Sequence, residues 1–343
     1  MRTRLPALRV ESEALEGEVL IDAKATLREI RTDFEPARLE LRKLLARRPT
    51  DRNPLERLLF YLSLQLVWVL RRAIPRLRGP DVCFYPERPT VYYTIWPVCQ
   101  LLGIKRTADP SSADTVCLFV DSDYDKEADE LARVSLEREL AESPRPVINI
   151  GCLDVGKGTV GEAFEEVFGY PLNIDPTTHD GLVVEKSDAN ARHDGRLVRC
   201  PIPAADSNCA YQVFANSLGD DSLVHFMRIP IMGNSIPFVY RKALVPDERF
   251  KGEAGGAAPA TIAETADCLS SDEVELILQM CRELGADMAE ADVLRDNDSQ
   301  HIYVVDVNKT CYGPPKWIGF LDRYRAIVRL AGAFRSEFLE HAV

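Results

Sequence analysis

The chain has 343 residues, of which 46% are hydrophobic and 28% charged, and its formal net charge at pH 7 is −12. This composition is typical of a soluble globular protein, and the length predicts two or three subdomains. The acidic balance argues against nucleic acid as the main partner, because nucleic-acid phosphates bind clustered Lys and Arg.

Residues 1–80 are predicted to form an accessory helical region. A weakly amphipathic helix is expected over residues 23–47, followed by the apolar segment Leu58–Leu70 and then by several arginines. Thirteen apolar residues are too few to span a bilayer, which needs about 20. Burial between domains is therefore favoured for Leu58–Leu70. The alternatives are a homodimer surface and a helix lying on an anionic membrane surface.

The nine cysteines include no C-x-x-C pair, so neither a zinc ribbon nor a redox motif is indicated. Most of them lie in apolar patterns, where a free thiol behaves as a small hydrophobe. Residues 1–20 are charged throughout and lack the apolar core of a secretory signal. We therefore expect a protein of the reducing cytoplasm.

Residues 81–150 alternate between short apolar strands and helices, which predicts a small parallel α/β domain. Strands are expected at 82–85, 115–120 and 147–150, and helices at 91–103 and 126–142. A loop at 151–158 then leads into a helix at 159–168.

Residues 151–343 are predicted to form a strand-rich domain, and the fold class of the whole chain is α/β (α+β). The expected antiparallel strands lie at 181–187, 196–202, 210–214, 223–231 and 236–244. A small-residue loop is expected at 251–266, followed by a helix at 272–284 capped by Ser270 or Ser271. A final helix is expected at 319–341.

The segments 286–296 and 301–310 are predicted to form an antiparallel hairpin with one acidic face. A turn centred near Ser299 places Asp292 opposite Asp306, Glu290 opposite Asn308, and Leu294 opposite Val304. Directly opposed carboxylates weaken a sheet, whereas Mg²⁺ is held by carboxylate and amide oxygens together with substrate phosphates. The pattern favours a metal site, and simple turn chemistry by Asp and Asn is the alternative.

Several cations could hold phosphates opposite this hairpin. Lys186 ends an apolar strand, and the following loop, residues 188–195, offers backbone N–H groups and His193. Lys186 could equally be a solvated residue of a sheet edge. Lys157 precedes a helix but lacks the spacing of a P-loop. Arg228 and Lys242 lie in otherwise apolar strands, where a charge either faces water or meets an anion.

From about Val147 to the C-terminus, the order of these parts resembles the ATP-grasp superfamily, and is most similar to its glutathione-synthetase and ribosomal-protein glutamate-ligase branch. The similarity rests on Lys157 before a helix, Lys186 in LVVEKS, the strands FMRIPIMG and PFVYRKALV, the acidic hairpin, and YGPP after it. Residues 81–150 look like the small domain that usually precedes an ATP-grasp module, residues 151–343.

The resemblance implies ATP and Mg²⁺, or Mn²⁺ in its place, as cofactors. It assigns metal ligation to Asp292, Asp306 and Asn308, and phosphate contacts to Lys157 and Lys186. The candidate site further has His193 over the phosphates, Gln212 near the adenine, and Arg228 and Lys242 as catalytic residues. The sequence departs from the family where Asp306 replaces the usual Glu, where the loop at 188–195 has one glycine, and at Phe226 and Glu290.

The expected function is an ATP-dependent ligase that activates a carboxylate as an acyl phosphate for attack by an amine of a small molecule or peptide. A small-molecule kinase on the same scaffold and a catalytically inactive ATP binder are the alternatives. A metal-dependent hydrolase is disfavoured because the five histidines are scattered along the chain.

Overall fold

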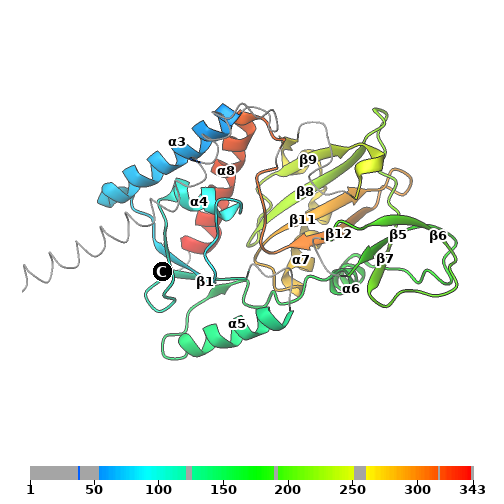
Figure 1. The fold of residues 1–343 in the computed structure, drawn as a ribbon, viewed down its shortest axis with the longest axis horizontal. Coiled ribbons are helices and arrows are strands. Elements are labelled where there is room, and N and C mark those ends of the chain that lie inside the picture. Colours follow the sequence, from blue (N-terminus) through cyan, green and yellow to red (C-terminus); the bar gives the residue numbers. More distant parts are fainter. Residues whose placement is uncertain are drawn as a thin grey trace, which may run out of the picture. The chain divides into compact units, whose positions relative to one another are not determined.

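The computed structural model describes Arg38 and residues 54–120, 126–188, 192–250, 260–315 and 317–340. The chain divides into two units, residues 1–70 and 71–343. Figure 1 shows the helices and strands in order along the sequence. The helix expected at 23–47 lies outside the described residues except for Arg38, and so does most of the loop expected at 251–266.

Helix α3 (Pro54–Ala73) contains the apolar segment Leu58–Leu70. Phe60, Leu64 and Trp68 recur every four residues and are buried, which is the pattern of one helix face. Several leucines on the other faces, Leu59, Leu62, Leu66 and Leu70, are exposed. None of the helices in the described ranges combines the length and the apolar character that crossing a bilayer requires.

The second unit begins with a four-stranded parallel sheet in the order β2-β1-β3-β4. Its strands are β1 (Asp81–Pro86), β2 (Lys105–Thr107), β3 (Thr115–Phe119) and β4 (Val147–Ile148), and its helices are α4 (Ile95–Leu102) and α5 (Lys126–Glu139). Ala132 and Leu136 of α5 pack into one core with Cys83, Val116 and Leu118 of the sheet. The predicted parallel α/β arrangement is confirmed, with β2 as an additional short edge strand.

A five-stranded antiparallel sheet, in the order β10-β9-β8-β11-β12, forms the centre of the remaining chain. Its strands are β8 (Val224–Met232), β9 (Val239–Leu244), β10 (Thr261–Ala263), β11 (Met288–Arg295) and β12 (Ile302–Asn308). Strand β10 lies inside the segment expected to be a loop. A separate three-stranded antiparallel sheet, in the order β6-β5-β7, comprises β5 (Gly181–Ser187), β6 (Arg196–Cys200) and β7 (Cys209–Val213).

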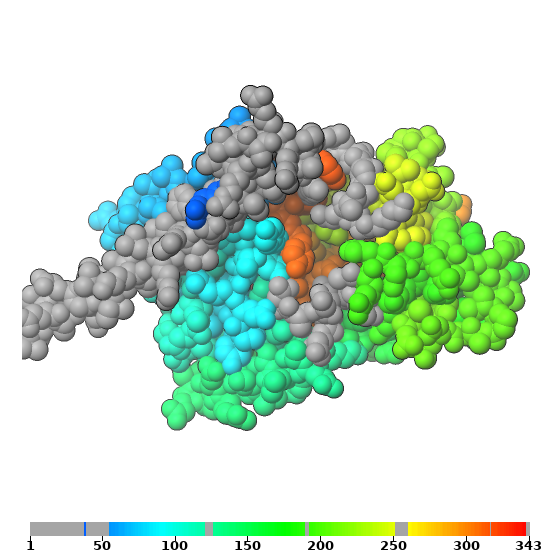
Figure 2. Space-filling view, viewed as in Figure 1, coloured from blue at the N-terminus to red at the C-terminus, as the bar shows by residue number. Residues whose placement is uncertain are grey.

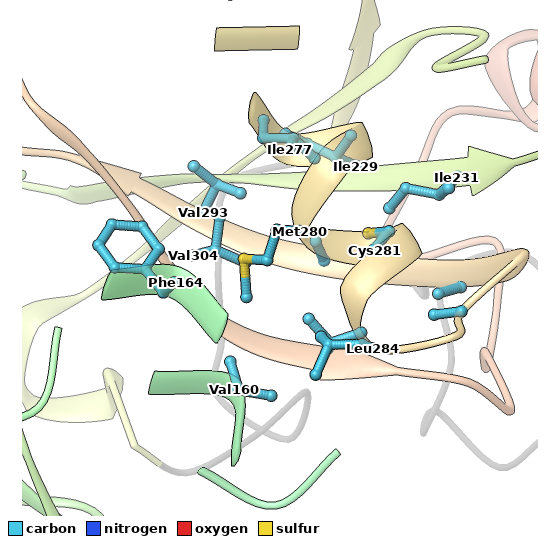
Figure 3. Close-up of a cluster of buried hydrophobic side chains, with 14 of the residues drawn as sticks. Val160, Phe164, Ile229, Ile231, Ile277, Met280, Cys281, Leu284, Val293 and Val304 are labelled. Carbon is cyan, nitrogen blue, oxygen red and sulfur yellow. The ribbon is translucent and has the colours of Figure 1, made fainter. Parts of the chain in front are cut away.

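One face of the five-stranded sheet carries the main core, together with α6 (Lys157–Phe168) and α7 (Ser271–Glu283). Figure 3 shows Phe164 of α6, Met280 of α7 and Val293 of β11 in this cluster. Burying each such side chain contributes about 1.5–3 kcal/mol. Ser270 begins α7 with a capping box: its hydroxyl accepts from the Glu273 amide while the Glu273 carboxylate accepts from the Ser270 amide.

The C-terminal helix α8 (Phe320–Phe334) packs against α4 and continues as a π-helical turn over Arg335–Leu339. It is shorter than the helix expected at 319–341, whose last residue lies outside the described part. The short 3-10 helices are η1 (Pro75–Leu77), η2 (Pro246–Glu248) and η4 (Thr265–Asp267). The mixed α/β class predicted from the sequence is therefore confirmed.

Candidate active site

The acidic hairpin has the predicted register where its acidic residues lie. Asp292 of β11 is opposite Asp306 of β12, and Glu290 is opposite Asn308. Residues directly opposite each other, and residues two apart, project from the same face of a sheet. These side chains therefore share the face opposite to the one that packs against α6 and α7.

The predicted pairing of Leu294 with Val304 is wrong. Val293 is opposite Val304, and Leu294 is opposite Tyr303, because the register shifts between Asp292 and Val293. The extra residue is in β12, between Asp306 and Val304. A bulge of this kind lets the acidic end face outward while the apolar ends of both strands stay in the core.

Arg228 of β8 lies directly across from Asp292 and forms a two-point ion pair with it. The Arg228 Nε donates to Asp292 Oδ1 at 2.8 Å, and Nη2 donates to Oδ2 at 3.1 Å. Burial would raise the pKa of the Asp292 carboxyl, but the charge and hydrogen bonds of Arg228 outweigh burial and lower the pKa below its ordinary value. Both carboxylate oxygens of Asp292 therefore face a guanidinium.

Asp306 and Asn308 offer hard oxygen ligands of the kind that Mg²⁺ prefers. Asn308 Nδ2 donates to Asp306 Oδ2 at 3.1 Å, which orients the two side chains together. Asp306 Oδ1 is buried and accepts no hydrogen bond from the described residues. A buried anionic oxygen without a hydrogen bond among the described residues fits a metal ligand, since buried acceptors are otherwise satisfied. Within the described ranges, no group of three or more His, Cys, Asp or Glu is placed to hold a metal ion.

Lys157 lies beside Asp306, with its Nζ 3.6 Å from Asp306 Oδ1. Its position at the start of α6 is fixed by local contacts. Asn173 Nδ2 donates to the Lys157 carbonyl at 3.1 Å. Gly161 permits this approach, because a Cβ there would lie 2.0 Å from Asn173 Nδ2. The glycine thus leaves room for Asn173 to hold the backbone of Lys157.

The N-terminus of α6 is occupied by carboxylates from the chain itself. The Gly158 amide donates to Asp188 Oδ1, and the Gly156 amide donates to Asp154 Oδ1, both at 2.8 Å. Acidic groups are favourable at a helix N-terminus. Because these two amides already have partners, the Lys157 side chain is a better candidate than either of them for a phosphate contact, in agreement with the absence of P-loop spacing.

Lys186, in β5, is near enough to Asp306 and Lys157 for the charges of both to act on it. Burial lowers the pKa of its ammonium to about 8, the charge of Asp306 partly opposes this shift, and the charge of Lys157 adds to it. The solvated-edge alternative does not explain this shift, since a water-exposed lysine keeps its ordinary pKa. An ammonium in this position is stabilised by any further anion that enters the site.

Gln212, in β7, lies opposite Val184 of β5, two residues from Lys186, so Gln212 and Lys186 share one face of the three-stranded sheet. Its side chain is 1% exposed, and neither the amide oxygen nor the amide nitrogen has a hydrogen-bond partner among the described residues. A buried amide without partners costs about 1–3 kcal/mol. A ligand with a paired donor and acceptor, such as an adenine edge, would satisfy both atoms.

The remaining predicted residues differ in their placement. Lys242 of β9 is half-buried on the same face as Arg228, with its Nζ 4.9 Å from the centre of the Phe226 ring. His193 is exposed and has a positive φ of 52°. It lies in the loop after β5, of which residues 189–191 are outside the described part. Among the described residues, no contact between His193 and the acidic face is seen.

Two further interactions at the site were not predicted. Thr94 Oγ1 donates to the Glu290 carboxylate at 3.3 Å, and burial raises the pKa of Glu290 to about 7. Lys309, next to Asn308, is buried against Asp129 of α5 and also donates to the Cys152 carbonyl at 3.3 Å. The only sign of this buried pair in the sequence pattern was a lysine, Lys309, directly after the acidic strand. No sequence pattern indicated the contact of Thr94 with Glu290, because 196 residues separate them.

Figure 2 shows that the molecular surface is hollowed between segments coloured cyan and green, with orange atoms from the C-terminal part of the chain at the bottom of the hollow.

All nine cysteines are among the described residues and are free thiols, and most of them are buried. Thiols are therefore not among the candidate catalytic or ligand-binding groups of the site, which are carboxylates, amides, lysines and one arginine.

No protein-family model and no curated protein matches this chain. Among solved structures, the ATP-grasp ligase PsnB, complexed with a phosphomimetic variant of its minimal precursor, Mg and ADP, aligns with a TM-score of 0.50 and 13% identity, over 75% of this chain and 97% of that chain. A RimK domain ATP-grasp protein from Sphaerobacter thermophilus aligns with a TM-score of 0.43 and 13% identity, over 76% of this chain and 99% of that chain. The macrocyclase MdnC from Microcystis aeruginosa, bound with its precursor peptide MdnA, aligns with a TM-score of 0.40 and 11% identity, over 75% and 98%.

Proposed function

Because this chain has the ATP-grasp fold, we propose that it is an ATP- and Mg²⁺-dependent ligase that joins a carboxylate to an amine through an acyl phosphate. The observation that carries the proposal is the arrangement around Asp306. Its orphaned oxygen lies 3.6 Å from the Lys157 ammonium, and its charge acts on Lys186. Lysines from two elements thus surround an acidic strand end, as a metal-bound triphosphate requires.

Each part of the nucleotide has a candidate partner in this chain. Lys157 and Lys186 would hold the phosphates, and the Gln212 amide would bind the edge of the adenine. Asp306 and Asn308 would hold the ion, and Asp292 would join them if Arg228 turned toward the transferred phosphoryl group. When bound, Mg²⁺ supplies Lewis-acid neutralisation of the β- and γ-phosphates.

The proposed chemistry has two steps. In the first, a carboxylate oxygen of the donor attacks the γ-phosphorus, and ADP leaves with the electrons of the broken P–O bond. In the second, the acceptor amine attacks the acyl carbon, inorganic phosphate leaves, and the nitrogen loses one proton. Arg228 and Lys242 would stabilise the negative charge on the phosphoryl group during transfer.

The donor or the acceptor can be part of a peptide or of a small molecule. The solved structures of PsnB and MdnC contain precursor peptides, which supports including peptides among the substrates to be tested. The cytoplasm remains the proposed compartment, in line with nine free thiols.

The test is ADP release in the presence of Mg·ATP and pools of amino acids, small carboxylates, peptides and amines, followed by mass spectrometry of the products. A ligase yields ADP, phosphate and an amide that contains both substrates. A stable phosphorylated product identifies a kinase instead. The Lys186→Ala variant should lose turnover and nucleotide affinity, while Lys105→Ala, a surface lysine of β2 paired with Asp81, should retain both.

One observation favours a second candidate, an ATP binder without turnover. Both oxygens of Asp292 are held by Arg228, which leaves Asp306 and Asn308 as the available metal ligands. This candidate predicts Mg·ATP binding by calorimetry with no ADP release in any pool. An amide product in any pool excludes it.

A further inference from the structure

Lys309 is a buried cation at the end of the acidic strand. It follows Asn308 directly and is 6% exposed, and its ammonium pairs with the carboxylate of Asp129, which is 1% exposed. The same ammonium donates to the Cys152 carbonyl at 3.3 Å. Burying two charges costs free energy that their mutual attraction often does not recover, so a buried ion pair is weak evidence of a role in stability. Such a pair can instead fix the relative position of the elements that it joins.

The three groups in this contact belong to different elements. Lys309 directly follows β12, Asp129 lies in the first turn of α5, and Cys152 lies in the segment between β4 and α6. Helix α5 is itself attached to its own sheet, because the Tyr85 hydroxyl of β1 donates to the Glu139 carboxylate at 2.9 Å. The ammonium therefore joins a fixed helix to the end of the acidic strand and to the segment that leads into α6.

A second ion pair connects the same turn of α5 to the start of α6. Lys126, three residues before Asp129, pairs with Asp154, and residues three apart on a helix are neighbours on its surface. Asp154 in turn accepts from the Gly156 amide at 2.8 Å. Lys157 is the next residue and begins α6. The first turn of α5 therefore contacts the segment that leads to Lys157 as well as the end of the acidic strand.

The separation of these two segments matters when metal ion and nucleotide are bound together. Under the proposed function, Lys157 binds a phosphate, whereas Asp306 and Asn308 bind the ion. The ion also binds phosphate oxygens, so the two segments must then lie at one fixed separation. Without the ion, the phosphates need to contact only the lysines.

We propose that Lys309 and Asp129 form a positioning pair, which sets the end of the acidic strand at the correct distance from the Lys157 turn for Mg·ATP. The pair acts through Asn308 and Lys157 and is not itself a ligand. This inference rests on the proposed function and adds to it a contribution from α5, a helix of the preceding α/β domain. Residues that hold metal ligands in place typically contribute about 10- to 100-fold to metal affinity.

The test replaces the pair with apolar side chains of similar shape. In the double variant Lys309→Met/Asp129→Leu, Met has the length of Lys, Leu has the branching of Asp, and the net charge of the chain is unchanged. Apolar replacement of a buried ion pair is often neutral for stability. The variant should therefore fold, which circular dichroism and the melting temperature verify. The affinity for ATP is then measured by calorimetry with Mg²⁺ and with excess EDTA.

The expected result is a smaller effect of Mg²⁺ on ATP affinity. The ratio of the affinities with and without the ion should fall about tenfold relative to the wild type, because the ion and the phosphates no longer meet at the correct separation. The matched control is Arg295→Met/Glu273→Gln. It removes the two-point ion pair between β11 and α7, with distances of 2.8 and 2.9 Å, while Gln keeps the capping box. Its ratio should equal that of the wild type.

A measurement on the wild-type chain tests the proposal even if the double variant does not fold. Hydrogen–deuterium exchange of α5 is compared with and without Mg·AMPPNP. Coupling between two sites is reciprocal, so the nucleotide should slow exchange in α5 more than in β2, an edge strand of the same domain.

Two kinds of failure are distinguishable. Equal slowing in α5 and β2, no slowing in α5, or a folded double variant with the wild-type Mg²⁺ ratio would overturn the positioning role and leave the ligase proposal in place. No binding of Mg·ATP by the wild-type chain would overturn the ligase proposal itself.

Discussion

Arg228 and Asp292 face each other on adjacent strands and form a two-point ion pair, with Nε–Oδ1 and Nη2–Oδ2 distances of 2.8 and 3.1 Å. Their side chains are only 15% and 19% exposed. The pair therefore connects the strand of the candidate catalytic arginine to the strand of a candidate metal ligand. A substitution of either residue should change the position and the charge environment of the other.

Removing one partner of this pair should be strongly destabilising. Asp292→Asn removes the carboxylate that accepts two hydrogen bonds from the buried guanidinium, and we expect the free energy of unfolding to fall by about 3–5 kcal/mol. Urea denaturation measures the change. The matched control is Asp322→Asn, which removes a surface pair with Arg325 and should cost less than about 1 kcal/mol. Equal losses of unfolding free energy in the two variants would show that the buried ion pair stabilises the fold no more than the surface pair does.

The same pair predicts a dependence of stability on pH. The pKa of Asp292 is lowered in the folded state from its ordinary value of 3.8. A lowered carboxyl pKa stabilises the fold fully above that ordinary value, and the contribution is lost as the pH falls through the folded-state pKa. The difference in unfolding free energy between the wild type and Asp292→Asn should therefore shrink as the pH falls below about 4.

Nucleotide binding should take up a proton at Lys186. Its pKa of about 8 in the free protein means that part of the population is neutral at pH 8–9, and the phosphates of ATP would restore the charged form. Calorimetry in two buffers of different ionisation enthalpy should show proton uptake near pH 9 and little at pH 6.5, with affinity falling as the pH rises above about 8. Uptake that persists in Lys186→Ala would assign the proton to another group.

Replacing Gln212 should move stability and nucleotide affinity in opposite directions. Gln212→Met keeps the volume of the side chain but removes a buried amide without partners, so the free protein should be unchanged or more stable by about 1–2 kcal/mol. Mg·ATP affinity should fall, because the adenine edge loses its partner. A variant that loses stability and keeps its affinity would show that Gln212 is structural.

Gly161 offers a test of how Lys157 is held in place. Alanine normally stabilises a helix interior by about 0.5–1 kcal/mol relative to glycine, but here its Cβ would lie 2.0 Å from Asn173 Nδ2. Gly161→Ala should therefore lower the melting temperature and weaken Mg·ATP binding. Gly332→Ala in α8, where no atom lies within 4 Å of the added Cβ, should raise the melting temperature.

The sequence was sufficient to predict most of the elements, though not β2 and β10, and the acidic register, because strand alternation and a polar turn are local signals. Asp292 opposite Asp306 and Glu290 opposite Asn308 both follow from the position of that turn. The bulge that displaces Val304 could not be predicted, since no residue type requires it. The family resemblance is confirmed at the level of the fold, and the roles of the individual site residues remain proposals.

The sequence pattern could not predict which side chains from segments far apart in the chain would come into contact. Arg228 meets Asp292 because β8 lies beside β11 in the sheet. The hairpin pattern predicts that β11 pairs with β12, but it does not predict which strand lies on the other side of β11. The partnership of Lys309 with Asp129 joins residues 180 positions apart. Such pairs depend on tertiary packing, which local periodicity does not encode.

The central claim is that Lys157, Lys186, Asp306 and Asn308 form a site for Mg·ATP. Isothermal titration of the wild-type chain with ATP, with Mg²⁺ and then with excess EDTA, alongside Asp306→Ala, tests it most directly. The account predicts saturable binding with Mg²⁺ that weakens at least about tenfold without the ion or without Asp306, the effect of losing one charged ligand. No binding, or binding indifferent to both Mg²⁺ and Asp306, would contradict it.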